Sequence, residues 1–304
     1  MEELHAMTKT PVFHSPDVIF SVVGISIAVY EVVIFTRSTR SSQMDLEVSA
    51  LPRPWRRMLG ACILSVLALQ SIPVCAAELW SAGKGSQILD TCKIDLTKDT
   101  VRTFWRDADG IPFGTIARVL TSLNLHGERM VCASNAGIHG KDLVPIGLYV
   151  ENGKVLRRLN KRKEGFGNFY LQPNGVFWLS DRGASISSTD EVQSRWEQIA
   201  PAIKFATQSG PILFLADQIN PVFTPGSDNR LVRNAVCLKS NAEIVLAKSR
   251  YPINLHDFAT VLRDEVGCHD GLYLDGSVSA LYPFEGRLIE TELGPMIGVV
   301  EPKH

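Results

Sequence analysis

Short apolar segments alternate with tight-turn sequences through most of the chain, and this pattern constrains the fold more than any other feature. Asn152-Gly153 and Asn174-Gly175 separate such segments, and Asn-Gly is the dipeptide most typical of two-residue β-hairpin turns. The pattern therefore predicts a chain built mostly from antiparallel strand pairs. The expected hairpins pair residues 146–150 with 154–159, 168–171 with 176–179, and 231–238 with 243–248.

Helical periodicity is confined to a few segments. Residues 113–125 and 189–199 place apolar side chains three and four residues apart, as on one face of an amphipathic helix. Asn254, followed three residues later by Asp257, predicts the start of another helix. A few helices among many hairpins indicate an α+β fold. We expect a single domain over residues 78–304, with a mostly antiparallel or mixed β-sheet and several packed helices.

The N-terminal region differs from the rest in its order of charge and hydropathy. Three arginines between residues 53 and 57 precede an apolar run, residues 59–69, and small residues that end at Ala77. This is the order of a secretory signal. We expect residues 58–77 to act as a signal-peptide-like segment and the protein to be exported, with the periplasm as its compartment. An uncleaved membrane anchor is the alternative interpretation.

A second apolar stretch, residues 18–35, lies within residues 1–57. It is long enough to span a bilayer, but it contains Glu31, and a charged side chain in lipid is costly. It is either a true membrane helix that anchors the protein or part of an over-extended reading frame that really starts at Met44 or Met58. Because a signal sequence belongs at the N-terminus, we favour over-extension. Membrane contact is expected only through these N-terminal segments.

Four cysteines lie within residues 78–304. In an exported chain, four cysteines can form two disulfides in three possible pairings. Free, buried cysteines are the alternative interpretation. The cysteines are Cys92, Cys132, Cys237 and Cys268.

Charge and motif content argue against several classes of partner. The chain has 31 basic and 32 acidic side chains, so no positive excess is available to neutralise the phosphates of a nucleic acid. No phosphate-binding or dinucleotide-binding glycine loop is present, and His126, His139 and His269 are scattered along the chain. We therefore expect no cofactor, no metal and no nucleic-acid partner.

Islands of small and polar residues interrupt the chain at points where strands should end. Amide and hydroxyl side chains at such points can hold sugar hydroxyls or phosphate oxygens, and an arginine can bind phosphate. A carboxylate there can act as an acid, a base or a nucleophile. Turn formation, solvent exposure and helix capping are the competing interpretations of each island taken alone. The candidate residues are Asn135 and Gly137; Gln208, Ser209 and Gly210; Arg233; His256; and Asp275, Gly276 and Ser279.

In this order, the islands resemble the motifs of the phosphodiester glycosidase family. Its bacterial branch is the part of the family that the stretches PIGLYVENGK, GNFYLQPNGVFWL and NLHDFATVLRD resemble more. The motifs are N-A-G-I from Asn135, Q-S-G-P from Gln208, R-N-A from Arg233 and D-G-S-V-S from Asp275. The resemblance implies hydrolysis of the bond between a sugar anomeric carbon and a phosphodiester oxygen, in a carbohydrate or phosphoglycan substrate. It implies that Asp275 is the acid, base or nucleophile, that Arg233 binds phosphate, and that the other candidates bind substrate.

The chain also departs from the family pattern. The unusual residues are Ile138, Asn234, Ser277 and Val278. Because Val278 stands where the family usually has glycine, the last loop should be reshaped. A non-catalytic envelope protein that binds glycans or phosphoglycans is therefore the main alternative function. A second catalytic carboxylate is left open among Glu151, Asp217 and Asp257.

Overall fold

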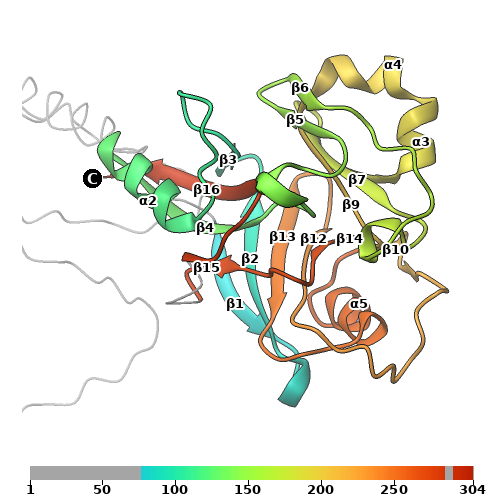
Figure 1. Cartoon of the computed structure of the whole chain (residues 1–304). Helices are drawn as coiled ribbons and strands as arrows, with labels where there is room; N and C mark the ends of the chain where they lie inside the picture. The colour runs from blue at the N-terminus through green and yellow to red at the C-terminus, as the bar shows by residue number, and fades with distance from the viewer. Residues whose placement is uncertain (1–76, 285–289, 304) are drawn as a thin grey trace, which may run out of the picture. The chain divides into compact units, whose positions relative to one another are not determined.

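The computed structural model describes residues 77–284 and 290–303 (Figure 1). Within them the strands form three sheets, and all neighbouring strands are antiparallel. The predictions for residues 1–57 and 58–77 fall outside the described residues, except at Ala77. No helix in the described part has both the length and the hydropathy needed to cross a membrane.

The seven-stranded sheet has the order β1-β2-β13-β12-β14-β10-β11. Its middle strands are buried along nearly their whole length because both of their faces are covered. Its strands are β1 (Glu78–Ala82), β2 (Leu89–Asp95), β10 (Ile212–Leu215), β11 (Gln218–Ile219), β12 (Asn234–Leu238), β13 (Glu243–Ser249) and β14 (Asp270–Asp275).

The two other sheets are smaller. The four-stranded sheet consists, in spatial order, of β15 (Leu281–Tyr282), β4 (Glu128–Asn135), β16 (Met296–Pro302) and β3 (Thr100–Phe104). The five-stranded sheet consists of β6 (Lys154–Arg157), β5 (Tyr149–Glu151), β9 (Ile203–Ser209), β7 (Gly175–Ser180) and β8 (Gly183–Ser188).

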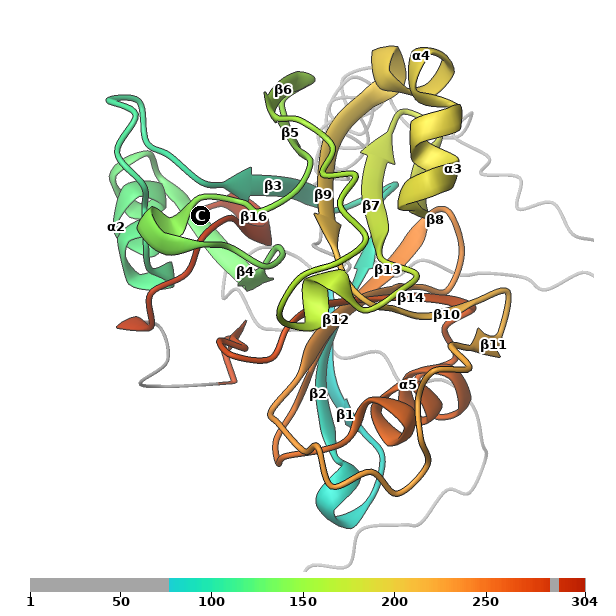
Figure 2. The same cartoon turned by 45° about the vertical axis from the view of Figure 1, so that its right-hand side comes forward.

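All three sheets contribute to one apolar core, and each sheet also packs against helix. The shared core joins Ile94, Phe177 and Ile297, one from each sheet. On the seven-stranded sheet, Phe258 of α5 is fully buried, which contributes about 2 kcal/mol relative to an exposed side chain. Figure 2 shows the helices outside three different groups of strands. They are α2 (Ile116–Leu125) on the four-stranded sheet, α3 (Thr189–Ser194) and α4 (Trp196–Ile199) on the five-stranded sheet, and α5 (Leu255–Asp264).

The expectation of mostly antiparallel sheet with a few helices is confirmed. The hairpin across Asn152-Gly153 forms as expected, with φ values of 50° and 74° at these two residues, as a type I′ turn requires. The hairpin β12–β13 is also confirmed. The single domain and its bounds stay predictions.

The hairpin expected across Asn174-Gly175 is wrong. Gly175 is the first residue of β7, which pairs with β8, the strand that follows it, and with β9. A Cβ at Gly175 would lie 2.7 Å from Cγ1 of Ile212, so this glycine permits close packing of strands and does not form a turn. Residues 168–170, expected as a strand, form a short 3-10 helix.

Two disulfides connect the four cysteines. Cys92 of β2 bonds Cys132 of β4, which ties the seven-stranded sheet to the four-stranded sheet. Cys237 of β12 bonds Cys268, which follows α5. The structure therefore selects one of the three pairings that the sequence left open.

Removal of the inter-sheet disulfide by the pair Cys92→Ala and Cys132→Ala should lower the free energy of unfolding by about 2–5 kcal/mol. The bond closes a loop between positions 40 residues apart, and its loss gives the unfolded chain more conformational freedom. Denaturant unfolding of both proteins measures the difference. Peptide mapping under non-reducing conditions should find Cys92 linked to Cys132, and a Cys92–Cys237 peptide would contradict this structure.

Candidate functional site

The first, third and fourth motifs meet where β4, β12 and β14 end or begin. Asn135 is the last residue of β4, Asn234 is the first of β12, and Asp275 is the last of β14. Asn234 pairs with Asp275 across the β12–β14 ladder. The β12–β14 ladder thus brings Asn234 and Asp275, 41 positions apart in the chain, to one end of the seven-stranded sheet. Asn135 reaches them from the end of β4 in the four-stranded sheet.

Two buried asparagines connect these strand ends. Nδ2 of Asn234 donates to Oδ1 of Asn135 (2.7 Å) and to Oγ of Ser134 (2.9 Å). Oδ1 of Asn234 accepts from the backbone N–H of Asp275 (2.9 Å). Oδ1 of Asn135 also accepts from the backbone N–H of Ala280 (3.0 Å). Because unpaired buried amides are costly, this network fixes the position of the Asp275 backbone.

Asp275 is a buried carboxylate held by its own turn. Its side chain is 5% exposed, and Oδ1 accepts from the backbone N–H groups of Gly276 (2.6 Å), Ser277 (2.8 Å) and Val278 (3.4 Å). Burial raises the pKa of Asp275, although these three amides and the nearby His139 oppose the rise. Oδ2 takes no part in the turn, so Oδ1 alone anchors the carboxylate to these backbone N–H groups.

Gly276 is needed because Tyr273 lies directly against it. A Cβ at Gly276 would lie 1.7 Å from the Tyr273 hydroxyl oxygen, a distance that no real contact allows. Ser279 closes the same turn, since its Oγ donates to the backbone oxygens of Asp275 (2.8 Å) and Val232 (3.1 Å). Both residues shape the loop that carries Asp275.

We expect Gly276→Ala to displace this loop and to reduce any activity that depends on Asp275 by at least about tenfold, with a stability cost of about 1–3 kcal/mol. The clash involves the Tyr273 hydroxyl, so adding Tyr273→Phe should recover part of both losses. Unfolding and activity of the two single variants and the double variant form the test. If Gly276→Ala lowered activity and stability by the same amounts in the wild-type and the Tyr273→Phe backgrounds, the clash with the Tyr273 hydroxyl would be contradicted.

Arg233 is almost completely buried, with 1% of its surface exposed. Its Nε donates to the backbone oxygen of Ile253 (2.6 Å), Nη1 to the Tyr273 hydroxyl (3.1 Å) and Nη2 to the backbone oxygen of Asn229 (2.8 Å). Adjacent residues of a strand point to opposite faces, so Arg233 and Asn234 face different sides of β12. The guanidinium therefore joins the loops before β12 and α5 to Tyr273, beneath the Asp275 turn.

The second motif lies beside the first and last motifs. A Cβ at Gly137 would lie 2.6 Å from Oγ1 of Thr207, so the first loop packs closely on the end of β9. Oγ of Ser209 donates to the backbone oxygen of Leu274 (2.8 Å), next to Asp275. A Cβ at Gly210 would lie 2.6 Å from the Cβ of Asn174.

The side chain of Gln208 is saturated by protein groups. Oε1 accepts from the backbone N–H groups of Leu148 (3.0 Å) and Asn160 (2.8 Å), and Nε2 donates to the Asn160 oxygen (2.8 Å) and to Thr189 Oγ1 (3.0 Å). Gln208 lies in β9, and these bonds hold the loop that follows β6 against that strand.

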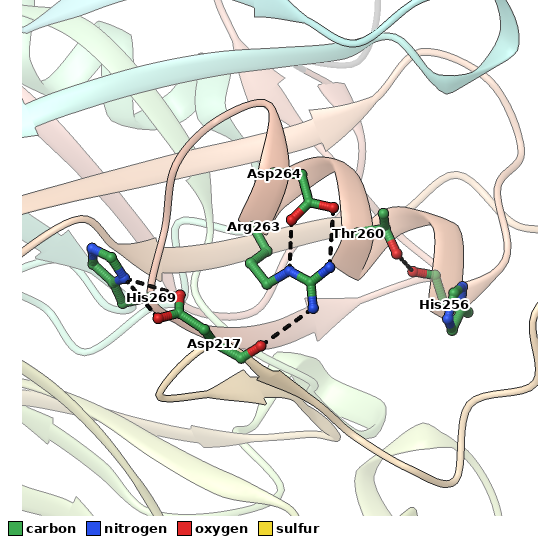
Figure 3. A network of polar contacts seen from close by, with 6 residues as sticks. All are labelled: Asp217, His256, Thr260, Arg263, Asp264 and His269. Atoms are coloured by element: carbon green, nitrogen blue, oxygen red, sulfur yellow. Dashed lines mark hydrogen bonds and ion pairs between the residues drawn. The ribbon is translucent and has the colours of Figure 1, made fainter.

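His256 lies apart from this cluster, in the first turn of α5 (Figure 3). Its backbone oxygen accepts from Oγ1 of Thr260 (2.9 Å), and its Nδ1 lies 3.5 Å from Oδ1 of Asp257. The other contacts in Figure 3, such as Nδ1 of His269 to Asp217 (2.9 Å), also stay outside the strand ends at Asp275. No contact in the described structure joins His256 to another predicted site residue.

The three open carboxylates do not contact Asp275 within the described residues. Asp257 caps α5 with Asn254, and Asp217 pairs with His269. Glu151 accepts from the Tyr149 hydroxyl (2.9 Å), and burial raises its pKa. It lines a cavity of about 850 Å³ whose size alone would favour a binding site. Because no motif residue lines that cavity, we place the site at Asp275.

His139 is a site residue that the sequence did not single out. It follows the first motif, and its charge acts on Asp275 and lowers the pKa of that carboxyl. Its Nε2 is buried and has no hydrogen-bond partner among the described residues. A Cβ at Gly294 would lie 2.6 Å from the His139 Cβ, so the ring is held by the chain before β16. Its position directly after the N-A-G-I motif is the sequence feature that could have identified it.

The described residues contain no group of three or more His, Cys, Asp or Glu side chains placed to hold a metal ion. The expectation that no metal is required stays a prediction. The acid–base groups at the strand ends are Asp275 and His139, and the polar groups around them are amides and hydroxyls. Such an arrangement can position a sugar and stabilise charge at a reacting carbon.

Comparison with known proteins decides the family. A model of the family described as phosphodiester glycosidase matches residues 128–296, more than half of the chain. The chain belongs to the phosphodiester glycosidase family. The matched range contains all ten predicted site residues, and the resemblance inferred from the four motifs is confirmed.

Two relatives extend the match. The Escherichia coli (strain K12) protein YigE is 30% identical over 236 residues, which is 77% of this chain and 90% of YigE. Among solved structures, the chain resembles the catalytic domain of zebrafish N-acetylglucosamine-1-phosphodiester alpha-N-acetylglucosaminidase, auto-inhibited by its pro-peptide. The TM-score is 0.50 at 12% identity, with 76% of this chain and 84% of the zebrafish chain covered. This similarity shows a shared fold.

Proposed function

We propose that this protein is an exported hydrolase that cleaves the bond between a sugar anomeric carbon and a phosphodiester oxygen, with Asp275 as the reacting carboxylate. The observation that carries the proposal is the placement of Asp275. It is buried, its pKa is raised, and its backbone is fixed by Asn234 at the point where three family motifs meet. A carboxylate held in this way is suited to a charged, sugar-based transition state.

The chemistry requires little from the leaving group. The bond between the anomeric carbon and the phosphodiester oxygen breaks, its electron pair stays on that oxygen, and water supplies the new sugar hydroxyl. Because a phosphomonoester is already a good leaving group, strong protonation of its oxygen is not needed. The positive charge that develops on the sugar needs a carboxylate nearby, and Asp275 serves as nucleophile or as the base that activates water.

His139 is the second group that we assign to the reaction. Its orphan Nε2 and its electrostatic interaction with Asp275 make it suitable for moving a proton to or from the reacting water. This assignment supplies a proton carrier without a second carboxylate. It accounts for the absence of contacts from Glu151, Asp217 and Asp257 to Asp275 in the described residues.

The remaining predicted residues divide into three roles in this proposal. Asn135 contacts the substrate through Nδ2, whose bond to Asn234 is long at 3.4 Å. Gly137, Gly210 and Gly276 allow the close backbone approaches that shape the site. His256 stays a predicted substrate contact. The other members hold the loops in place. They are Gln208, Ser209, Arg233 and Ser279.

Export is supported by two observations. Residues 58–77 have the order of a secretory signal. The four cysteines of the described chain form two disulfides, and disulfides persist mainly in oxidising compartments. Cell fractionation with the native N-terminus tests this part of the proposal, because a purely cytosolic protein would contradict it.

The proposed activity is tested by incubating the full chain with N-acetylglucosamine-1-phosphodiester and glucose-1-phosphodiester substrates. We expect free reducing sugar to be released from at least one of them. A folded protein that binds these compounds without releasing sugar would favour the alternative, a non-catalytic glycan-binding protein of the cell envelope.

A further inference from the structure

A cavity at the five-stranded sheet is bordered by the loop that follows β6 and by the helices α3 and α4. It holds about 530 Å³, and its walls include Arg158, Leu159 and Lys161 from the loop and Trp196 from α4. Within the described structure, no residue of the Asp275 turn lines it. The hydrolysis proposed above therefore leaves this cavity without a role.

The loop carries a dense positive charge. Five of the seven residues from 157 to 163 are basic, although the whole chain has a formal net charge of −1. Like charges packed into so short a segment repel one another. A bound anion relieves this repulsion, so the loop favours a negatively charged partner.

Arg158 and Lys161 are the basic side chains of this loop that line the cavity. Both are exposed, and neither side chain forms a hydrogen bond or an ion pair with any described residue. Lys163, in contrast, is paired with Asp190 (2.7 Å). The cavity lining thus carries two unpaired positive charges and one negative charge, that of Glu197. Paired guanidinium and ammonium groups of this kind are typical phosphate ligands.

Trp196 gives the same cavity an aromatic wall. The ring packs in part against the apolar cluster of the five-stranded sheet, which includes Val192, and it is only partly buried. Its indole N–H has no acceptor among the described residues. A tryptophan offers an apolar face and a single donor, which suits the apolar face and the hydroxyl groups of a sugar ring. An aromatic wall with a few polar groups is also typical of ligand sites.

Gln208 of the second motif holds both walls of the cavity. Its side chain forms two hydrogen bonds of 2.8 Å with the backbone of Asn160, which lies between the two unpaired basic residues. It also donates to Oγ1 of Thr189 (3.0 Å), the first residue of α3. The strand of Gln208, β9, ends at Ser209, which bonds the backbone oxygen just before Asp275. One strand therefore connects the cavity to the proposed reaction site.

We propose that this cavity binds a second sugar-phosphate unit of a phosphoglycan chain, with the sugar against Trp196 and a phosphate at Arg158 and Lys161. The inference rests on the proposed function, because it makes the preferred substrate a chain of several such units, one of which is cleaved at Asp275. A phosphoglycan alternates sugar and phosphate, and the cavity offers a surface for each. A substrate with one sugar and one phosphate would occupy the reaction site alone.

The test uses the full chain and two substrates. One is a single sugar-1-phosphodiester, and the other is an oligomer of N-acetylglucosamine-1-phosphate units linked as phosphodiesters. In the double variant Arg158→Gln and Lys161→Gln, we expect KM for the oligomer to rise about tenfold, because two charge-assisted contacts are lost. The kcat for the oligomer and both constants for the single unit should stay unchanged. Trp196→Leu, which keeps apolar packing, should raise KM for the oligomer several-fold.

The matched control is the pair Lys84→Gln and Arg182→Gln, which removes the same two charges from exposed positions outside the cavity. It should match the wild type on both substrates. An unchanged KM for the oligomer in the Arg158→Gln and Lys161→Gln variant would overturn the proposal. An equal rise in the control would overturn it as well, because the effect would then reflect total charge and not this cavity.

A binding measurement on the wild type needs no turnover. The oligomer should slow reductive methylation of Lys161, read by mass spectrometry, without slowing that of Lys84. Lack of this selective protection would overturn the proposal, and equal protection by inorganic polyphosphate would overturn the placement of a sugar at Trp196. Selective protection by the oligomer without any release of sugar would support this site and count against the proposed hydrolysis, so the two failures are distinguishable.

Discussion

Asp275→Asn should reduce sugar release by about 1,000-fold or more while leaving the protein folded. Asparagine has nearly the same shape, and its Oδ1 can still accept from the backbone N–H groups of Gly276 and Ser277. The loss would therefore come from the missing carboxylate and not from a displaced loop. Initial rates with saturating substrate, combined with thermal unfolding, measure the two effects separately.

The same variant should be at least as stable as the wild type at neutral pH. Burial raises the pKa of Asp275 in the folded protein above its value in the unfolded chain. The folded state therefore binds this proton more tightly, and stability falls as pH rises through the interval between the two pKa values. Above that interval the wild type carries the full cost of a buried carboxylate, which asparagine removes.

Asp217→Asn is the matched control for this pair of measurements, because Asp217 is an exposed carboxylate paired with His269. It should leave sugar release unchanged. Turnover by Asp275→Asn within tenfold of the wild type would exclude Asp275 as the reacting group, and an equal loss in Asp217→Asn would show that the effect is not specific to the strand ends.

Arg233→Ala should lower the free energy of unfolding by about 4 kcal/mol, because each buried acceptor left without a partner costs about 1–3 kcal/mol. The backbone oxygens of Ile253 and Asn229 and the Tyr273 hydroxyl would all lose a donor. The vacated volume adds a cavity term. Equilibrium denaturation in urea measures the loss.

The control for this change is Arg195→Ala. Arg195 forms an exposed pair with Glu191, four residues away on the chain, and such pairs contribute only about 0.5 kcal/mol. If Arg233→Ala kept the stability of the wild type and raised only KM for phosphate-bearing substrates, the structural role assigned to Arg233 would be wrong. A direct phosphate contact would then replace it.

Sequence patterns predicted helices and hairpins well where the cap or turn is formed by residues close together in the chain. Asn254 caps α5 by accepting from the backbone N–H of Asp257 (2.8 Å), and both residues lie within one turn of chain. The Asn152-Gly153 hairpin was equally predictable, since the two φ values depend on these residues alone. The turn expected at Asn174-Gly175 failed because Gly175 is required by packing against Ile212, 37 positions later.

The site was predictable only as a set of candidates. Asp275 could be named because an acid at a strand end is visible in the sequence. Asn234 was noted only as a departure from the family pattern, although it connects Asn135 to Asp275. Its importance follows from the β12–β14 register, which no local pattern determines.

The most direct test of the proposed hydrolysis is to determine which bond is broken. The full chain would hydrolyse a sugar-1-phosphodiester in water enriched in ¹⁸O, and mass spectrometry would locate the label in the products. We predict ¹⁸O in the anomeric hydroxyl of the released sugar and none in the phosphomonoester. Label in the phosphate would show attack at phosphorus, which would contradict a glycosidase with Asp275 at the anomeric carbon.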